Sequence, residues 1–140
     1  FWIAAPIAAL LSRRRPLVGL AIYGVMSVNI VAHVTGGIVA GTIYNPGWLT
    51  ALLLFLPLTA WTVRILSGRG GFRRGAWAFL MGWGIALHLI LAVSLVPLVK
   101  GWISTPAPAI VLQVVNAGLL ILVSWLAERW RGGVLIRPAS

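Results

Sequence analysis

Long apolar runs that alternate with short basic segments are the feature that most constrains this chain. A helix crosses the roughly 30 Å of hydrocarbon in a bilayer with about 20 residues, and in lipid it must satisfy its own backbone polar groups. Four runs of about that length follow one another, at residues 16–44, 46–63, 76–99 and 106–127. The sequence therefore predicts an all-α fold, a polytopic transmembrane helix bundle with four full spans in residues 16–127.

A shorter apolar segment, residues 1–12, precedes the first full span, and a basic tail, residues 128–140, follows the last one. The eleven residues before Ser12 would cover only about 17 Å as a helix, which is about half of the hydrocarbon thickness. Because residue 1 is Phe and not Met, we expect a processed or incomplete N-terminus and the tail of a span that starts before Phe1. A short partial insertion is the alternative.

The composition fits a protein that is solvated by lipid. Apolar residues make up 61% of the chain and charged residues 9%, against about 25% charged in ordinary globular proteins. There is no Cys, and Glu128 is the only acidic residue. Thiolate chemistry, paired-carboxylate hydrolysis and a Ser-His-Asp triad all need groups that this chain lacks. The composition argues against an enzyme whose residues all come from this chain.

The basic residues predict the orientation. Ten arginines fall on one side of a four-crossing path, and only Lys100 falls on the other. Positive residues are retained on the cytoplasmic side, so we expect the basic segments and the C-terminus in the cytoplasm and the Tyr44–Gly47 turn outside, in the plasma (inner) membrane. The net charge of +10 then reflects topology. We expect the lipid bilayer as partner, with other membrane helices or a second copy as further candidates, and no nucleic acid.

Polar and small residues gather in the outer half of the first full span. Asn29 and His33 are four residues apart and share one helix face, and glycines continue the stripe, namely Gly36, Gly37 and Gly41. One interpretation is a close helix contact, in which small residues admit a neighbour and Asn and His hydrogen-bond across. The other is a functional site, because an ionisable residue inside a membrane commonly marks one and His can bind a metal or carry a proton.

Three further polar residues lie in the third and fourth spans: His88, Gln113 and Asn116. Counted from the expected outer ends of their spans, His33 and His88 lie at similar depths of about 16 to 18 Å. This predicts that both imidazoles reach one cavity, which the two amides could also line. The alternatives are a His88 bonded to a Ser or a backbone carbonyl, and amides that only hold helices together.

The spacing of these residues resembles a known family. Asn29-x-x-x-His33, followed by Tyr44-Asn45-Pro46-Gly47 and an apolar run, is similar to the HXXEE-domain family of bacterial membrane proteins over residues 1–65. The resemblance implies that His33 is the family's second histidine and that Tyr44, Pro46 and Gly47 are its Tyr-x-Pro-Gly motif. The name-giving His-x-x-Glu-Glu is absent from this chain, and the resemblance places it before Phe1.

The function stays open between three classes. The first is an HXXEE-type protein of uncharacterised activity, in which metal chemistry is implied only by the resemblance, no cofactor motif is present, and His33 is the metal-ligand candidate to test first. The second is a non-catalytic subunit or packing partner of a larger membrane complex. The third is a small transporter, which the absence of a carboxylate from every span makes the weakest of the three.

Overall fold

The computed structural model describes residues 3–42, 47–68 and 71–136, and it is helical almost throughout. The elements are α1 (Ala4–Leu11), α2 (Pro16–Val39), α3 (Trp48–Thr50), the π-helical η1 (Ala51–Phe55), α4 (Leu56–Gly68), α5 (Arg74–Val99) and α6 (Ala107–Leu135). Four continuous stretches are long and apolar enough to cross a membrane: Pro16–Val39, Trp48–Ser67, Arg74–Val99 and Ala107–Gly132. The predicted all-α bundle with four apolar spans is confirmed.

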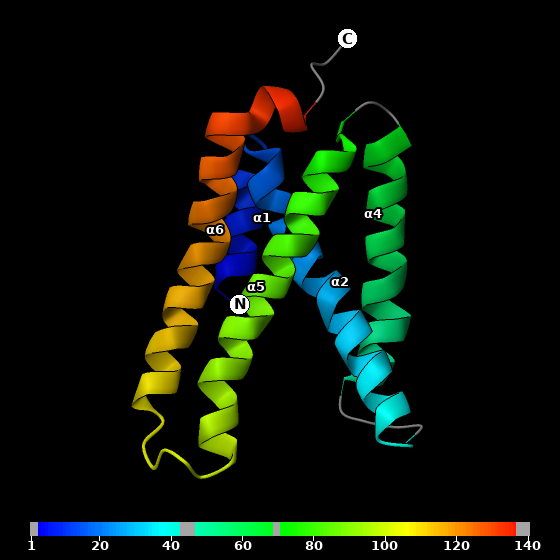
Figure 1. Ribbon diagram of the computed structural model, residues 1–140. Helices are drawn as coiled ribbons and strands as arrows, with labels where there is room; N and C mark the ends of the chain where they lie inside the picture. Colours follow the sequence, from blue (N-terminus) through cyan, green and yellow to red (C-terminus); the bar gives the residue numbers. More distant parts are fainter. Residues whose placement is uncertain (1–2, 43–46, 69–70, 137–140) are drawn as a thin grey trace.

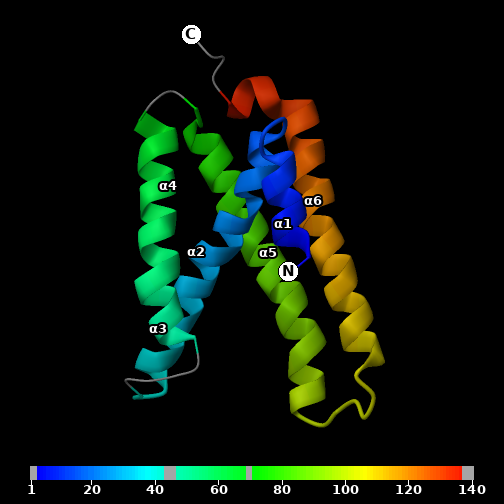
Figure 2. The same ribbon diagram turned by 180° about the vertical axis from the view of Figure 1, so that it is seen from behind.

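Helix α2 is the centre of the bundle. It contacts α1, α5 and α6 as well as the span built from α3, η1 and α4. Helices α5 and α6 form a hairpin on one side of α2, and α4 lies on the other side (Figure 1). The short helix α1 packs against α2 and α6 and reaches only about halfway along the bundle (Figure 2). Fully buried leucines fill the space between α2, α5 and α6: Leu17, Leu80, Leu87 and Leu120.

Two glycines set the crossing of α2 and α5. A Cβ atom built on Gly24 would lie 2.2 Å from the carbonyl oxygen of Leu80, and one on Gly84 would lie 2.5 Å from that of Gly24. The two backbones therefore touch, which small residues permit between membrane helices. Beyond this point the helices diverge, so that α2 continues beside α4 and α5 continues beside α6 (Figure 1).

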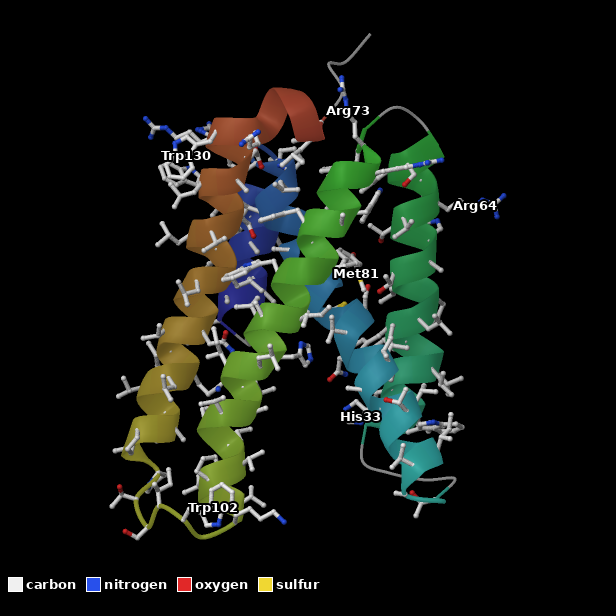
Figure 3. All side chains as sticks on the ribbon, in the orientation of Figure 1. His33, Arg64, Arg73, Met81, Trp102 and Trp130 are labelled. Atoms are coloured by element: carbon white, nitrogen blue, oxygen red, sulfur yellow. The ribbon has the colours of Figure 1, made fainter. Side chains whose placement is uncertain are left out.

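The described basic segments lie at one end of the bundle, which we call the arginine end. The α1–α2 turn, the end of α4, the start of α5 and the end of α6 lie there, while the end of α2 and the α5–α6 connection lie at the opposite end (Figure 1). Arg64, Arg73 and Trp130 mark the arginine end, and Trp102 marks the opposite one (Figure 3). The described basic segments, which are far apart in the sequence, thus lie together at one end of the bundle.

Some helix bounds differ from those that hydropathy suggests. Helix α2 ends at Val39, five residues before Tyr44, because Gly41 adopts a φ of +63°. The N–H of Gly41 donates to the carbonyl of Ile38 and that of Thr42 donates to Gly37, a glycine-terminated helix end known as the Schellman motif. At the other terminus α6 continues to Leu135, so the described part of the basic tail begins as helix.

The span from Trp48 to Ser67 changes its helical register near its proline. Residues Ala51–Phe55 are π-helical and precede Pro57. A proline removes one backbone donor and its ring collides with the carbonyl four residues earlier. The wider π turn is one way to accommodate such a break inside a helix. The span can therefore stay continuous through Pro57.

Candidate functional site at His33 and Gly47

His33 lies against the turn that follows its own helix. A Cβ atom on Gly47 would lie 2.6 Å from Cε1 and 2.7 Å from Nε2 of the imidazole, so only glycine fits there without a shift. Gly47 also has a φ of +91°, a backbone conformation that favours glycine. His33 is part-buried and lies in the half of the bundle that ends near Trp102, away from Arg64 and Arg73 (Figure 3). The folding of the chain thus brings together a histidine and a turn glycine fourteen positions apart.

The Gly47→Ala substitution should show this contact directly. The strained φ should lower the free energy of unfolding by about 1 kcal/mol, and displacement of the imidazole, which can rotate away, should add about 1 kcal/mol more. In a His33→Ala background the ring is gone, and only the strain of about 1 kcal/mol should remain. Thermal unfolding of the four proteins in detergent measures this double-mutant cycle. Additive effects of the two substitutions would contradict the contact.

Other members of the predicted motif are only partly described. Tyr44, Asn45 and Pro46 lie outside the described residues, and Gly47 is the first described residue after them. Asn29 lies one turn further into α2 than His33 and is part-buried. Whether Asn29 acts together with the imidazole stays a prediction.

His88 is hydrogen-bonded within its own helix. Its Nδ1 lies 2.9 Å from the carbonyl oxygen of Gly84. A carbonyl can only accept a hydrogen bond, so Nδ1 is the donor of this bond. The structure thus supports the interpretation of His88 as a histidine satisfied by a backbone carbonyl.

The two amides of α6 hold the α5–α6 hairpin together. Asn116 is fully buried, and its Nδ2 donates to the carbonyl oxygen of Leu87 over 3.1 Å. The Nε2 of Gln113 donates to the hydroxyl of Ser94 on α5. These bonds are the helix-to-helix bonding that polar side chains provide in membrane proteins. The Oδ1 of Asn116 is buried without a hydrogen-bond partner among the described residues.

The two histidines lie at different distances from the point where α2 and α5 cross. From the α2–α5 crossing, His33 lies nine residues along α2 and His88 lies four residues along α5, which correspond to about 14 Å and about 6 Å. Because α2 ends at Val39, the equal depths expected from the sequence also differ, with His33 about 9 Å and His88 about 17 Å from their helix ends. That the two imidazoles share a cavity stays a prediction, and equal depth no longer supports it.

The three glycines expected to pack helices have different environments. Gly37 is buried inside α2, whereas a Cβ on Gly36 or on Gly41 would meet no atom within 4 Å. Gly41 ends the helix, so Gly37 and Gly41 are not a helical packing pair within this chain. The glycines in backbone contact are instead Gly24 and Gly84, which pattern reading missed because a lone glycine inside an apolar run carries no partner information.

The described residues do not provide a metal site of their own. No group of three or more His, Cys, Asp or Glu side chains comes together among them. A structural metal needs about four protein ligands and a catalytic one about three. The metal implied by the family resemblance therefore does not fit the donors that residues 3–42, 47–68 and 71–136 supply, and we derive no chemistry through one.

Glu128 has a structural role that sequence reasoning missed. Its Oε2 accepts a hydrogen bond of 2.9 Å from the backbone N–H of Leu17, in the first turn of α2, and its Oε1 lies 4.0 Å from Arg15. A carboxylate at a helix N-terminus satisfies a free backbone donor and interacts favourably with the helix dipole. The chain's one acidic side chain thus joins α6 to the start of α2.

The comparison with protein families gives a match over the first part of the chain. The family model described as "Protein of unknown function with HXXEE motif" matches residues 1–62. Neither the curated proteins nor the solved structures gave a significant match. The matched segment contains α1, α2, the His33–Gly47 contact and most of the span after it. The predicted family resemblance is confirmed, and residues 1–62 match the family of proteins of unknown function with an HXXEE motif.

Proposed function

We propose that this chain is a non-catalytic helical module of the bacterial plasma membrane that binds another membrane helix through the outer half of α2. The arginine end lies in the cytoplasm, as the positive-inside rule requires of ten arginines against one lysine. The observation that carries the proposal is that these polar side chains cap a helix or hold helices and turns together, as the side chains of a packing module do. Glu128 caps α2, Asn116 and Gln113 join α5 to α6, and His33 packs on Gly47.

The surface for a partner helix is the exposed face of α2 beside the His33–Gly47 contact. Ala32, Gly36 and Ala40 are exposed and recur every four residues, so they share one face. No atom of the described residues lies within 4 Å of a Cβ built on Gly36. Small residues at this spacing let a second helix approach closely in a membrane. His33 and Gly47 support this face by fixing where the following turn lies.

The test compares two exposed glycines. Gly36→Leu should abolish the stoichiometric association of the chain with a second membrane protein, or with itself, measured by native mass spectrometry of protein extracted in native lipid discs. Gly118→Leu is the matched control, because Gly118 is an exposed glycine in a span and a Cβ on it also meets nothing within 4 Å. A wild-type chain that is always extracted as a lone monomer would refute the proposal, as would equal effects of the two variants.

A second candidate function is a histidine-centred site at the outer end of α2. The observation that favours it is the contact of His33 with Gly47, since both residues belong to the motif that the family resemblance singles out. This candidate expects His33→Ala to remove cellular function while membrane insertion and stability persist, and His88→Ala to have a smaller effect. If His33→Ala lowered cellular function only as much as it lowered the amount of folded protein, His33 would be a packing residue and this candidate function would be refuted.

A further inference from the structure

A pocket opens beside the arginine end of the bundle, between α1, α2 and α4. It measures about 370 Å³. Most of its lining is apolar, and the lining residues come from three helices and the loop before α5, among them Ala9, Ser12, Pro16, Tyr23, Leu66 and Phe72. From Pro16 to Tyr23 the lining extends about 10 Å along α2, towards the middle of the bundle. A mostly apolar pocket whose lining extends this far along a helix is suited to part of a hydrocarbon chain.

Exposed arginines lie close in the sequence to residues that line the same pocket. Arg13 and Arg14 are exposed and lie in the turn between Ser12 and Pro16, both of which line the pocket. Arg73 is exposed and directly follows Phe72, which also lines it. Glu128 is the only acidic side chain of the chain, and it is engaged by Arg15 and the N–H of Leu17. No carboxylate side chain is left to pair with these three arginines.

We propose that this pocket binds one anionic phospholipid, with its phosphate at Arg13, Arg14 and Arg73 and the upper part of one acyl chain between α1, α2 and α4. Basic pockets between membrane helices on the cytoplasmic side bind anionic headgroups, and arginine pairs with phosphate through two parallel hydrogen bonds. Charge complementarity selects the headgroup, and the apolar lining selects a lipid over a free phosphate.

A second groove in the molecule provides an internal comparison. It is larger, about 550 Å³, and is lined by α1, α5 and α6 with almost only apolar residues. No lining residue there is next to an arginine in the sequence. A lipid chain in that groove would have no reason to prefer an anionic headgroup. We therefore expect only the pocket near Arg13 and Arg14 to prefer an anionic lipid over a zwitterionic one.

The assignment of this lipid to the cytoplasmic leaflet rests on the orientation proposed above. Lipid binding itself can be measured in detergent, where no leaflet exists, so a failure of the orientation and a failure of the lipid site are distinguishable. The probes are phosphatidylglycerol and phosphatidylcholine with identical acyl chains, added to the purified chain and quantified by native mass spectrometry. Glycerol phosphate serves as the soluble headgroup without a chain.

Removal of charge at the pocket should reduce phosphatidylglycerol binding selectively. The double variant Arg13→Gln/Arg14→Gln should bind it about 30-fold more weakly, about 1 kcal/mol for each arginine. Arg129→Gln/Arg131→Gln removes the same charge from two exposed arginines on α6, a helix that contributes no residue to the lining of this pocket, and should leave binding unchanged. Arg13→Lys/Arg14→Lys should retain most of the affinity, which separates loss of charge from loss of fold.

Filling the pocket should reduce the binding of both lipids without altering charge. Ala9→Leu places a larger side chain in the lining, and Gly118→Leu does the same in the uncharged groove as a control. If the two double Arg→Gln variants lost phosphatidylglycerol binding equally, the lipid would be attracted by the overall positive charge and not by this pocket, and the proposed site would be overturned. Unchanged binding in Ala9→Leu, or displacement of the lipid by glycerol phosphate at equal concentration, would overturn the acyl-chain pocket.

Discussion

A single methyl group at Gly84 is expected to lower the free energy of unfolding by about 3 kcal/mol or more. The new Cβ would lie 2.5 Å from the carbonyl oxygen and 2.6 Å from the carbonyl carbon of Gly24. Backbone atoms cannot rotate away as a side chain can, so α2 and α5 must separate along their whole contact. Overpacking of a tight core typically costs about 1 to 3 kcal/mol, and this crossing also supports the packing of Leu17, Leu80 and Leu87.

The control for this prediction lies two residues away on the same helix. Gly82 is exposed, and a Cβ on it would meet no atom within 4 Å. Gly82→Ala should therefore be neutral or stabilising by up to about 1 kcal/mol, because alanine has the higher helix propensity. Unfolding in detergent, followed by circular dichroism, compares the two variants. Equal effects of Gly82→Ala and Gly84→Ala would show that α2 and α5 do not touch at this point.

A second substitution at the crossing tests whether the two glycines act together. Gly24→Ala should cost about as much as Gly84→Ala, since its Cβ would lie 2.2 Å from the carbonyl oxygen of Leu80. Once the helices have separated, the second methyl group meets less obstruction. The double variant should therefore cost less than the sum of the single variants, as expected of residues in contact.

The second large effect is expected at Glu128. Glu128→Ala should destabilise the protein by about 2 to 3 kcal/mol, because it leaves the N–H of Leu17 without its acceptor in a residue that is fully buried. Glu128→Gln keeps a side-chain oxygen that can accept the same hydrogen bond, and should cost about 1 kcal/mol. Chemical unfolding of both variants in the same detergent provides the comparison.

Arg15→Gln separates the helix cap from the ion pair. The Arg15 side chain is 43% exposed and its guanidinium lies 4.0 Å from Glu128, so solvent screens much of their attraction. Exposed ion pairs contribute about 1 kcal/mol or less, and Arg15→Gln should therefore be the mildest of the three changes. If Arg15→Gln destabilised the protein as much as Glu128→Ala, the ion pair and not the backbone bond would join α6 to α2.

Hydropathy and charge were enough to predict where the spans run and how the two ends differ. The predicted spans and the four apolar helices coincide closely except at their ends, where Gly41 stops α2 before Tyr44 and α6 continues to Leu135. The end of α2 near Gly41 could have been predicted from the sequence, because glycine commonly follows the last residues of a helix. It was overlooked because the apolar run continues beyond it.

The candidate site was predictable only in its residue types. His33 and Gly47 were both singled out from the sequence, but their contact depends on the direction in which the chain returns after α2. Gln113 and Asn116 were recognised as polar residues, and their partners Ser94 and Leu87 are known only from the α5–α6 hairpin. Gly24, Gly84 and Glu128 received no such role, since their contacts are with residues far away in the sequence.

The sequence by itself determined that the chain is a helical protein with four apolar spans, and that its arginines lie in the segments before the first predicted span, between the second and third spans and after the fourth. Those properties follow from local hydropathy and from charge, which each segment carries whatever its neighbours are. Only the tertiary structure decided which helices touch, at Gly24 and Gly84, and that Glu128 caps α2. The reason is that lipid is as apolar as a leucine side chain, so an apolar helix face does not reveal whether it meets lipid or another helix.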